Sequence, residues 1–269
     1  MLQKKLSLSF KMFVSVALLL SVGAFVMTAD ASHSWGNYHW ARTANPFTLQ
    51  LGNNVTGTWG THLATASTDW SVSSVLDTAV VTGLTNSKNC KAVKGRVEVC
   101  NRTYGNNGWL GIAQIWISGS HITQGAVKVN DTYFNTLTYN NPNEKLHVMC
   151  QEIGHTLGLD HQSTDGGSLG TCMDYFSNTG TNAGSTQSTH PNDHDYAQLE
   201  AIYAHLDSVT TLLGKVAGTS ARAGNDDIDV TDPKEWGKEV RKDKKGKESL
   251  YERDLGKGNK LFTFVVWAE

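Results

Sequence analysis

The sequence has few features that would link it to nucleic acid or to a membrane. Its 23 Lys and Arg are offset by 25 Asp and Glu, so no basic excess points to a nucleic-acid partner. After residue 31 no run is apolar enough to cross a bilayer. The four cysteines show no C-x-x-C spacing, which argues against a zinc site built from cysteines. The composition that remains, 18% charged and 39% hydrophobic, suits one soluble domain with a core, plus an extension.

The N-terminus has the pattern of a secretion signal. Lys4, Lys5 and Lys11 form a basic leader, and residues 13–27 form an apolar run. Residues 29–31, Ala-Asp-Ala, have the small-x-small form of a cleavage site. The alternative is an uncleaved membrane anchor, but the run is short for a bilayer span. We therefore expect residues 1–31 to be a signal peptide and the mature protein to be secreted, with no membrane contact after cleavage.

The most informative stretch runs from Gln151 to His161 and reads Q-E-x-x-H-x-x-G-x-x-H. Residues four apart on a helix lie about 40° apart around the axis and about 6 Å apart along it, so Gln151 and His155 can reach one metal ion. Glu152 lies about 100° further round, where it can approach a metal-bound water without ligating the metal. Gly158 can leave helical dihedrals, which lets His161 return to the same ion.

The other face of this stretch is apolar at helical spacing and predicts a buried stripe, with members Leu146, Met149, Ile153 and Leu157. A helix with one face for a core and one for a metal fits an active-site helix. His147 lies two turns from His155, about 12 Å along the axis, so we expect it to be exposed or outside the ligand set.

The stretch resembles the extended signature of the metzincin clan of zinc endopeptidases, H-E-x-x-H-x-x-G-x-x-H, with Gln151 in place of the first histidine. The gametolysin-like members with Q-E-x-x-H-x-x-G-x-x-H are similar to it here. Cys-Met-Asp-Tyr at 172–175 resembles the clan's methionine turn. The resemblance implies Zn²⁺ held by His155, His161 and Gln151, and Glu152 as general base. It also implies Met173 packed beneath the ligands and Tyr175 as a zinc or oxyanion partner.

Gln151 leaves two interpretations open. An amide oxygen is a harder and weaker zinc donor than an imidazole nitrogen. Either Gln151 is the third ligand of a working site, or the site is degenerate and the protein is a non-catalytic binding protein. The retained Glu152 favours the working site, since a dead site has no use for a general base. Tyr175 likewise has a plain alternative, a core tyrosine with a structural partner.

Export allows disulfides, and four cysteines allow three pairings. We favour Cys90 with Cys100, which closes a short loop, and Cys150 with Cys172. The second bond would join the metal helix to the methionine turn. The alternative is four buried thiols.

The rest of the chain predicts an α+β domain. Strands are expected at residues 47–51, 95–99, 110–117 and 125–130, and helices at about 69–81, at about 143–157 and after Asn192 or Asp193. By resemblance, residues 125–129 would be the sheet edge that pairs with substrate, or the strand just beside it. The loop 177–189 is expected to be mobile. His190 and His194 are expected to cap and pack rather than to bind a metal.

Residues 214–269 differ in composition from the rest. They contain twelve of the Lys and Arg and eleven of the Asp and Glu. We expect a linker and a charged C-terminal extension, either a solvated tail or a small accessory module, with a strand-like run at 261–267. The resulting hypothesis is a secreted, monomeric, metzincin-like zinc endopeptidase acting on protein or peptide substrates. Its fold would be a twisted mixed sheet with an active-site helix and a C-terminal helix in residues 32–213. Residues 32–46, between the signal and the first strand, contain no cysteine, so we expect no cysteine-switch segment of the matrixin type there.

Overall fold

The computed structural model describes residues 33–213, 231–243 and 245–268, and in these ranges nine strands form one mixed sheet. The predicted signal peptide and linker lie outside the described residues. The strands are β1 (His39–Trp40), β2 (Phe47–Asn54), β3 (Leu76–Thr82), β4 (Val97–Arg102), β5 (Trp109–Ser118), β6 (His121–Asn130), β7 (Lys238–Lys242), β8 (Glu248–Gly256) and β9 (Asn259–Trp267).

The sheet has a parallel half and an antiparallel half. Its order is β3-β2-β4-β6-β5-β9-β8-β7, and β1 adds to the start of β6. The neighbours from β3 to β6 run parallel, whereas β5 and the three last strands run antiparallel to their neighbours. The predicted strands at 47–51, 95–99, 110–117 and 125–130 are therefore present, with bounds shifted by a few residues.

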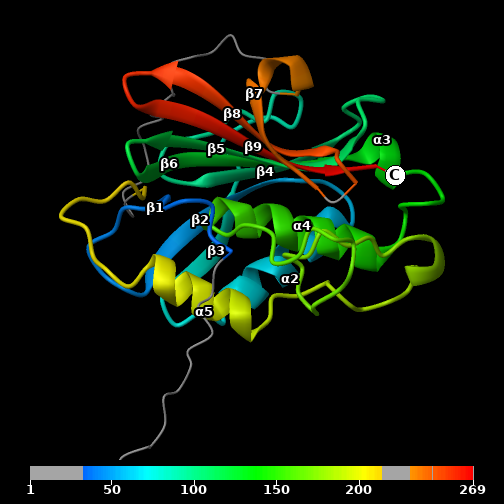
Figure 1. Cartoon of the computed structure of the whole chain (residues 1–269), viewed down its shortest axis with the longest axis horizontal. Coiled ribbons are helices and arrows are strands. Elements are labelled where there is room, and N and C mark those ends of the chain that lie inside the picture. The colour runs from blue at the N-terminus through cyan, green and yellow to red at the C-terminus, as the bar shows by residue number, and fades with distance from the viewer. Residues whose placement is uncertain (1–32, 214–230, 244, 269) are drawn as a thin grey trace, which may run out of the picture. The chain divides into compact units, whose positions relative to one another are not determined.

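The helices lie on one side of the sheet, apart from the short α3 (Figure 1). They are α2 (Trp59–Trp70), α3 (Asp131–Phe134), α4 (Pro142–Thr156) and α5 (Asp193–Ile202), with single 3₁₀ turns at η1 (Gly180–Asn182) and η2 (Pro233–Glu235). No helix in the described part of the chain is long and apolar enough to cross a membrane. The predicted metal helix and C-terminal helix correspond to α4 and α5.

The main core lies between the sheet and helices α2 and α4. Of the stripe predicted on α4, Met149, Ile153 and Leu157 are fully buried there, and Leu146 is partly exposed. They pack with Trp70 of α2 and with strand residues such as Val127. Burial of this stripe holds the polar face of α4 in one orientation.

The prediction of a helix at 69–81 is wrong. Helix α2 ends at Trp70, and Leu76–Thr82 is a strand that pairs in parallel with β2. The Ser71 hydroxyl donates to Ser67 O at 2.8 Å and accepts from Thr78 N at 2.9 Å, which bridges the turn between the two elements. The β-branched residues beyond this turn favour a strand over a helix.

The C-terminal residues that the composition assigns to a charged extension form β7, β8 and β9 of the same sheet. Strand β9 pairs with β5 over its whole length, from Trp267 opposite Trp109 to Asn259 opposite Ser118. The strand-like run at 261–267 is confirmed. On the face away from α4, Val265 packs with Ile112 and Trp236 in a small second core. These strands are thus part of the domain.

Candidate metal centre

Helix α4 begins and ends where its sequence predicts. The Asn141 side chain caps the N-terminus by accepting from Glu144 N at 2.8 Å, and Pro142 occupies the first turn. At the other end Gly158 has φ +101°, a conformation that favours glycine. A Cβ at Gly158 would lie 2.8 Å from Tyr38 O, so no other residue fits there without movement. The chain therefore turns back beside the helix and carries His161 to it.

His155 and His161 lie together, as predicted, with ring centroids 4.6 Å apart and planes at 79°. The Nδ1 of His155 lies 2.9 Å from Leu159 O, and a carbonyl can only accept, so Nδ1 carries the proton. Its Nε2 is then an unprotonated nitrogen, and it is buried without a partner. Both nitrogens of His161 are also buried without a hydrogen bond. Each ring therefore keeps a lone pair available.

The surroundings keep both imidazoles neutral. Burial and then the neighbouring His161 hold the pKa of His155 well below its usual value. Burial, followed by the positive charge of Arg241, lowers the pKa of His161 to about 3. Neutral imidazole is the form that binds a metal.

Gln151 has its amide oriented by two backbone carbonyls. Its Nε2 donates to Cys172 O at 2.8 Å and to Asp174 O at 2.6 Å. A flipped amide would place an oxygen against two oxygens, so the orientation follows from the chemistry. The Oε1 atom is buried and has no hydrogen-bond partner. An unpaired buried acceptor of this kind costs ~1–3 kcal/mol, and a cation would remove that cost.

Glu152 is fully buried between α4 and β5. A Cβ at Gly111 of β5 would lie 2.8 Å from Glu152 Oε1, so the bare backbone of Gly111 makes room for this carboxyl. Neither carboxyl oxygen has a hydrogen-bond partner. Burial raises the pKa of Glu152 well above its usual value. The group is therefore a stronger base than an exposed glutamate.

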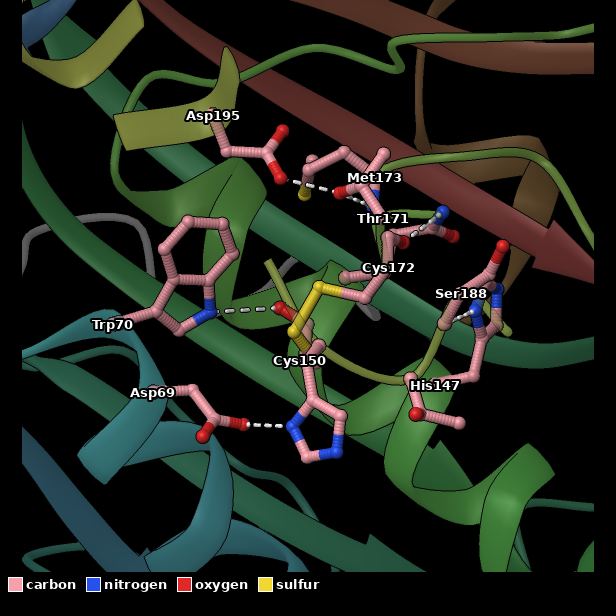
Figure 2. The surroundings of a disulfide bond; sticks show 12 residues. Asp69, Trp70, His147, Cys150, Thr171, Cys172, Met173, Ser188 and Asp195 are labelled. Carbon is pink, nitrogen blue, oxygen red and sulfur yellow. Dashed lines mark hydrogen bonds and ion pairs between the residues drawn. A yellow bond between two sulfur atoms is a disulfide. The ribbon is translucent and has the colours of Figure 1, made fainter. Parts of the chain in front are cut away.

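The methionine turn, residues 172–175, packs against α4. A Cβ at Gly154 would lie 2.4 Å from Met173 Sδ, so the thioether packs on the helix one residue before His155. The Cys150–Cys172 disulfide joins helix and turn, with Cα atoms 5.9 Å apart (Figure 2). The second predicted bond, Cys90–Cys100, is also present.

Neighbouring elements hold this staple in place. The Trp70 indole donates to Cys150 O at 3.1 Å, and Thr171, just before the turn, is hydrogen-bonded to Asp195 of α5 (Figure 2). The Thr171 hydroxyl also accepts from Met173 N at 2.9 Å. Helix α2 thus contacts the disulfide at its α4 end, and α5 contacts it at the turn.

Tyr175 lies beside the imidazoles, but its hydroxyl points to the last strand. Its ring packs edge-on against His161, with centroids 5.1 Å apart. The hydroxyl donates to Val265 O at 3.3 Å. In the described state this tyrosine therefore has a structural partner, as the plainer of the two interpretations expects.

Other histidines are placed apart from this group. His147 is buried, not exposed, and its Nδ1 bonds Ser188 O in the loop 177–189. Burial lowers the pKa of His147 to about 4. His190 pairs with Asp69 and His194 stacks on His33, in line with capping and packing roles.

The loop expected to be mobile is anchored to α4. Asn178 N donates to the Glu144 carboxylate at 2.5 Å, and the Ser177 hydroxyl donates to the same group at 3.1 Å. The contact of Ser188 with His147 fixes the other end.

Residues that the sequence reading missed cover the group from the C-terminal strands. The Phe264 ring stacks on His155, with centroids 4.0 Å apart and planes at 13°. Arg241 of β7 pairs with Asp160, which directly precedes His161. In the sequence, Phe264 is marked only as part of the strand pattern at 261–267, and that pattern does not show that its ring contacts His155. The expected free edge is also absent: residues 125–129 lie inside the sheet, and the strand beside them, β5, is covered by β9.

The donors fit a zinc ion. Gln151 Oε1, His155 Nε2 and a nitrogen of His161 are neutral, buried acceptors without partners on one end of α4 and the loop that follows it. Zinc takes nitrogen and oxygen ligands of these types.

Comparison with known proteins adds little. No family profile matches the chain, and no curated protein matches its sequence. A solved structure of High choriolytic enzyme 1, a hatching-enzyme zinc protease from the medaka fish Oryzias latipes, is similar at 11% identity and a TM-score of 0.37. The match covers 63% of this chain and 96% of that chain. A likeness this weak carries no argument, so any function has to be argued from the residues themselves.

Proposed function

We propose that the protein is a secreted zinc endopeptidase. One observation carries the proposal: three neutral, buried and unpartnered donor atoms, from Gln151, His155 and His161, are presented beside a buried glutamate that also has no partner. Leaving so many acceptors unpaired in one place is costly, and a divalent cation would satisfy them together.

Each residue then has a role in the reaction. Gln151, His155 and His161 would hold the ion, which would lower the pKa of a water molecule and polarise a peptide carbonyl. Glu152 accepts the proton of the attacking water and returns it to the leaving amine. The Leu159 carbonyl fixes the His155 tautomer, and the Cys172 and Asp174 carbonyls fix the Gln151 amide. The Tyr175 hydroxyl would be free to hold the oxyanion once it leaves Val265.

One observation favours the rival, a non-catalytic binding protein. The Phe264 ring covers His155 and the edge of β5 is paired, so the described state leaves no free strand edge beside the site. The rival would keep the metal-site architecture without turnover.

Metal analysis and peptide cleavage separate the two. The purified mature chain is expected to contain zinc and to cleave casein or a fluorogenic peptide, and a chelator should abolish cleavage. Bound zinc without cleavage would favour the binding protein, if it is found both in wild type and in Phe264→Ala, which removes the ring over His155. A zinc-free protein, or cleavage indifferent to the chelator, would remove the proposal.

A further inference from the structure

Away from α4, three imidazoles gather around one carboxylate oxygen. The Nε2 atoms of His121, His39 and His205 lie 3.2, 3.4 and 3.7 Å from Asp207 Oδ1. His39 belongs to β1, His121 is the first residue of β6, and the other two follow α5. None of them belongs to the group on α4.

Hydrogen bonds aim two of these atoms as acceptors. His39 Nδ1 lies 2.8 Å from Asn37 O and so carries the proton, which leaves its Nε2 with a lone pair. The other Asp207 oxygen, Oδ2, accepts from Arg42 Nη1 at 2.9 Å and from Arg42 N at 3.2 Å. With a neutral ring, His39 Nε2 and Asp207 Oδ1 face each other as two acceptors, an arrangement that a proton or a metal cation between them would satisfy.

The spacing of the donor atoms matches a coordination shell. A tetrahedral ion with bonds of about 2.0–2.1 Å has ligand atoms about 3.3 Å apart. His39 Nε2 and His205 Nε2 lie 3.1 Å apart, which with the 3.4 and 3.7 Å distances to Asp207 Oδ1 gives three edges of that size. His121 Nε2 lies 3.2 Å from the same oxygen, but the donor atoms that all lie within 4.8 Å of one another are those of His39, His205 and Asp207, so His121 lies beside this group.

Two of these four side chains are buried and two are partly exposed, so an ion can reach the group from solvent. The side chains of His39 and Asp207 are 6% and 11% exposed, whereas those of His121 and His205 are 30% and 53% exposed. The inner pair is held by Asn37 and Arg42, and the outer pair faces solvent. An ion can therefore enter from the surface and meet a preformed inner half.

We propose that His39, His205 and Asp207 bind a divalent transition-metal cation of the zinc type. Two imidazoles and one carboxylate suit zinc, cobalt or nickel better than calcium or magnesium, which prefer oxygen ligands. Three protein donors leave the fourth position of a tetrahedral ion to a water molecule. The bound ion would reinforce the contact between β1 and the segment that follows α5. In that segment Asp207 N donates to Arg42 O and Thr211 N donates to Ala41 O, both at 2.9 Å.

Metal counting on the full chain tests this site. The protein is stripped with chelator, titrated with Co²⁺ or Zn²⁺, and analysed for bound equivalents. His205→Ala is expected to bind one equivalent less than wild type. His190→Ala is the matched control, because its side chain is also 53% exposed and also pairs with an aspartate, yet it should bind as wild type does.

The difference in bound metal between wild type and the variant does not depend on the site at α4. Wild type should bind one equivalent more than the variant whether or not the α4 site is filled. Equal equivalents in wild type and His205→Ala, including none in both, would overturn the proposal. Stripped His205→Ala should melt within about a degree of stripped wild type, and zinc should raise the melting temperature of wild type more than that of the variant.

A second inference comes from a different observation, the position of β9. Strand β9 pairs antiparallel with β5. An extended peptide that binds a sheet by strand addition would take the same place beside β5. The same strand places Phe264 on His155, while Val265 O accepts from Tyr175 and Arg241 of β7 holds Asp160. Three contacts thus converge on the α4 site from one hairpin assembly.

We infer that β7–β9 act as a built-in inhibitor that holds the α4 site closed. This inference rests on the proposed peptidase function. The strands take the position of a substrate strand on β5, and they also occupy the Tyr175 hydroxyl. Activation would then require β9 to leave β5.

Two point variants in the full chain test the closure. Phe264→Ala removes the ring over His155, and Phe262→Ala is the matched control because its ring lies on the same strand but packs on Trp35 and Tyr38. Phe264→Ala is expected to speed zinc extraction by a chelator and to raise peptide hydrolysis, each about tenfold over Phe262→Ala. Arg241→Ala should add to both effects.

The two readouts separate the possible failures. If zinc-loaded Phe264→Ala and Phe262→Ala show the same extraction and hydrolysis, the closure is wrong. If extraction is faster in Phe264→Ala but no variant hydrolyses peptide, the closure stands as a structural fact and the peptidase function is wrong.

Discussion

Gln151 donates both amide hydrogens to backbone carbonyls, which directs its oxygen to a place where no other group meets it. The sequence places this residue one helical turn before His155 but does not show which end of the amide faces the metal. That choice depends on Cys172 and Asp174, which are more than twenty residues away. The ligand set could therefore be anticipated from spacing, and its orientation could not.

Gln151→His is expected to bind zinc more tightly and to fold less stably without it. An imidazole nitrogen is a better zinc donor than an amide oxygen. A histidine that ligates through one nitrogen has one N–H left for two carbonyls, and the unpaired carbonyl costs ~1–3 kcal/mol. Zinc titration and melting of the stripped protein measure both effects. Unchanged zinc affinity would mean that the Gln151 oxygen is not a ligand.

Glu152→Gln should keep the metal and lose most of the turnover. The change keeps the shape of the side chain and removes the proton acceptor, and general base catalysis contributes ~10²–10⁴-fold. The comparison is best made in the Phe264→Ala background, with zinc content and hydrolysis measured on the same sample. A rate within about tenfold of the parent would assign the proton transfer to another group.

His147 makes stability depend on pH. Its folded pKa of about 4 lies below the usual 6.5 because the ring is buried, so the unfolded chain binds its proton first as pH falls. The stabilising contribution is complete above pH 6.5 and is lost between 6.5 and about 4, by up to ~3 kcal/mol. His147→Gln keeps an N–H for Ser188 O and does not titrate. Denaturant unfolding of both proteins at pH 4 to 8 should show this difference, and parallel curves would contradict it.

At the level of elements, the strongest periodic signals were reliable. Helix α4 combines a capping asparagine, an N-terminal proline, an apolar stripe and a terminal glycine, and all four agree on its bounds. The segment at 69–81 is not one helix because five residues, 71–75, separate the end of α2 from the start of β3, while the apolar spacing continues across both elements. Apolar spacing alone does not locate such a turn; the serines at 71, 73 and 74 are the local signal that could have.

The two disulfides should differ in function more than in stability. Their cysteines are 22 and 10 residues apart, and loop closure predicts about 3 kcal/mol for each. Only Cys150–Cys172 ties the metal helix to the carbonyls that orient Gln151. Replacing Cys150 and Cys172 by alanine should therefore weaken zinc retention, while the same change at Cys90 and Cys100 lowers the melting temperature alone. Equal zinc loss in both variants would contradict this role of the staple.

For the molecule as a whole, the sequence predicted an α+β domain but not its extent. Residues 238–267 have the composition of a charged extension because β7 is largely exposed, β8 is mostly half-buried, and the charged residues of both strands hide the strand pattern. What recruits them is β9, whose Phe262, Phe264 and Val266 join the main core while Val265 joins the second one. A strand buried on both faces needs a partner, and sequence alone did not show that the partner is β5.

Two metal sites on different elements should stabilise the chain independently. A ligand that binds only the folded state, at a thousand times its dissociation constant, contributes ~4 kcal/mol per site. For a chain of this size, 1 kcal/mol shifts the melting temperature by ~2–4 °C, so each site should account for roughly 8–16 °C. The sites have no residue in common. His155→Ala and His205→Ala should therefore each remove the part of the zinc-induced rise in melting temperature that belongs to one site, and the double variant should remove both parts. Scanning calorimetry of stripped and zinc-loaded proteins measures this rise for each variant. A single variant that removes the whole shift would mean that the two groups of ligands form one linked unit or that only one of them binds metal.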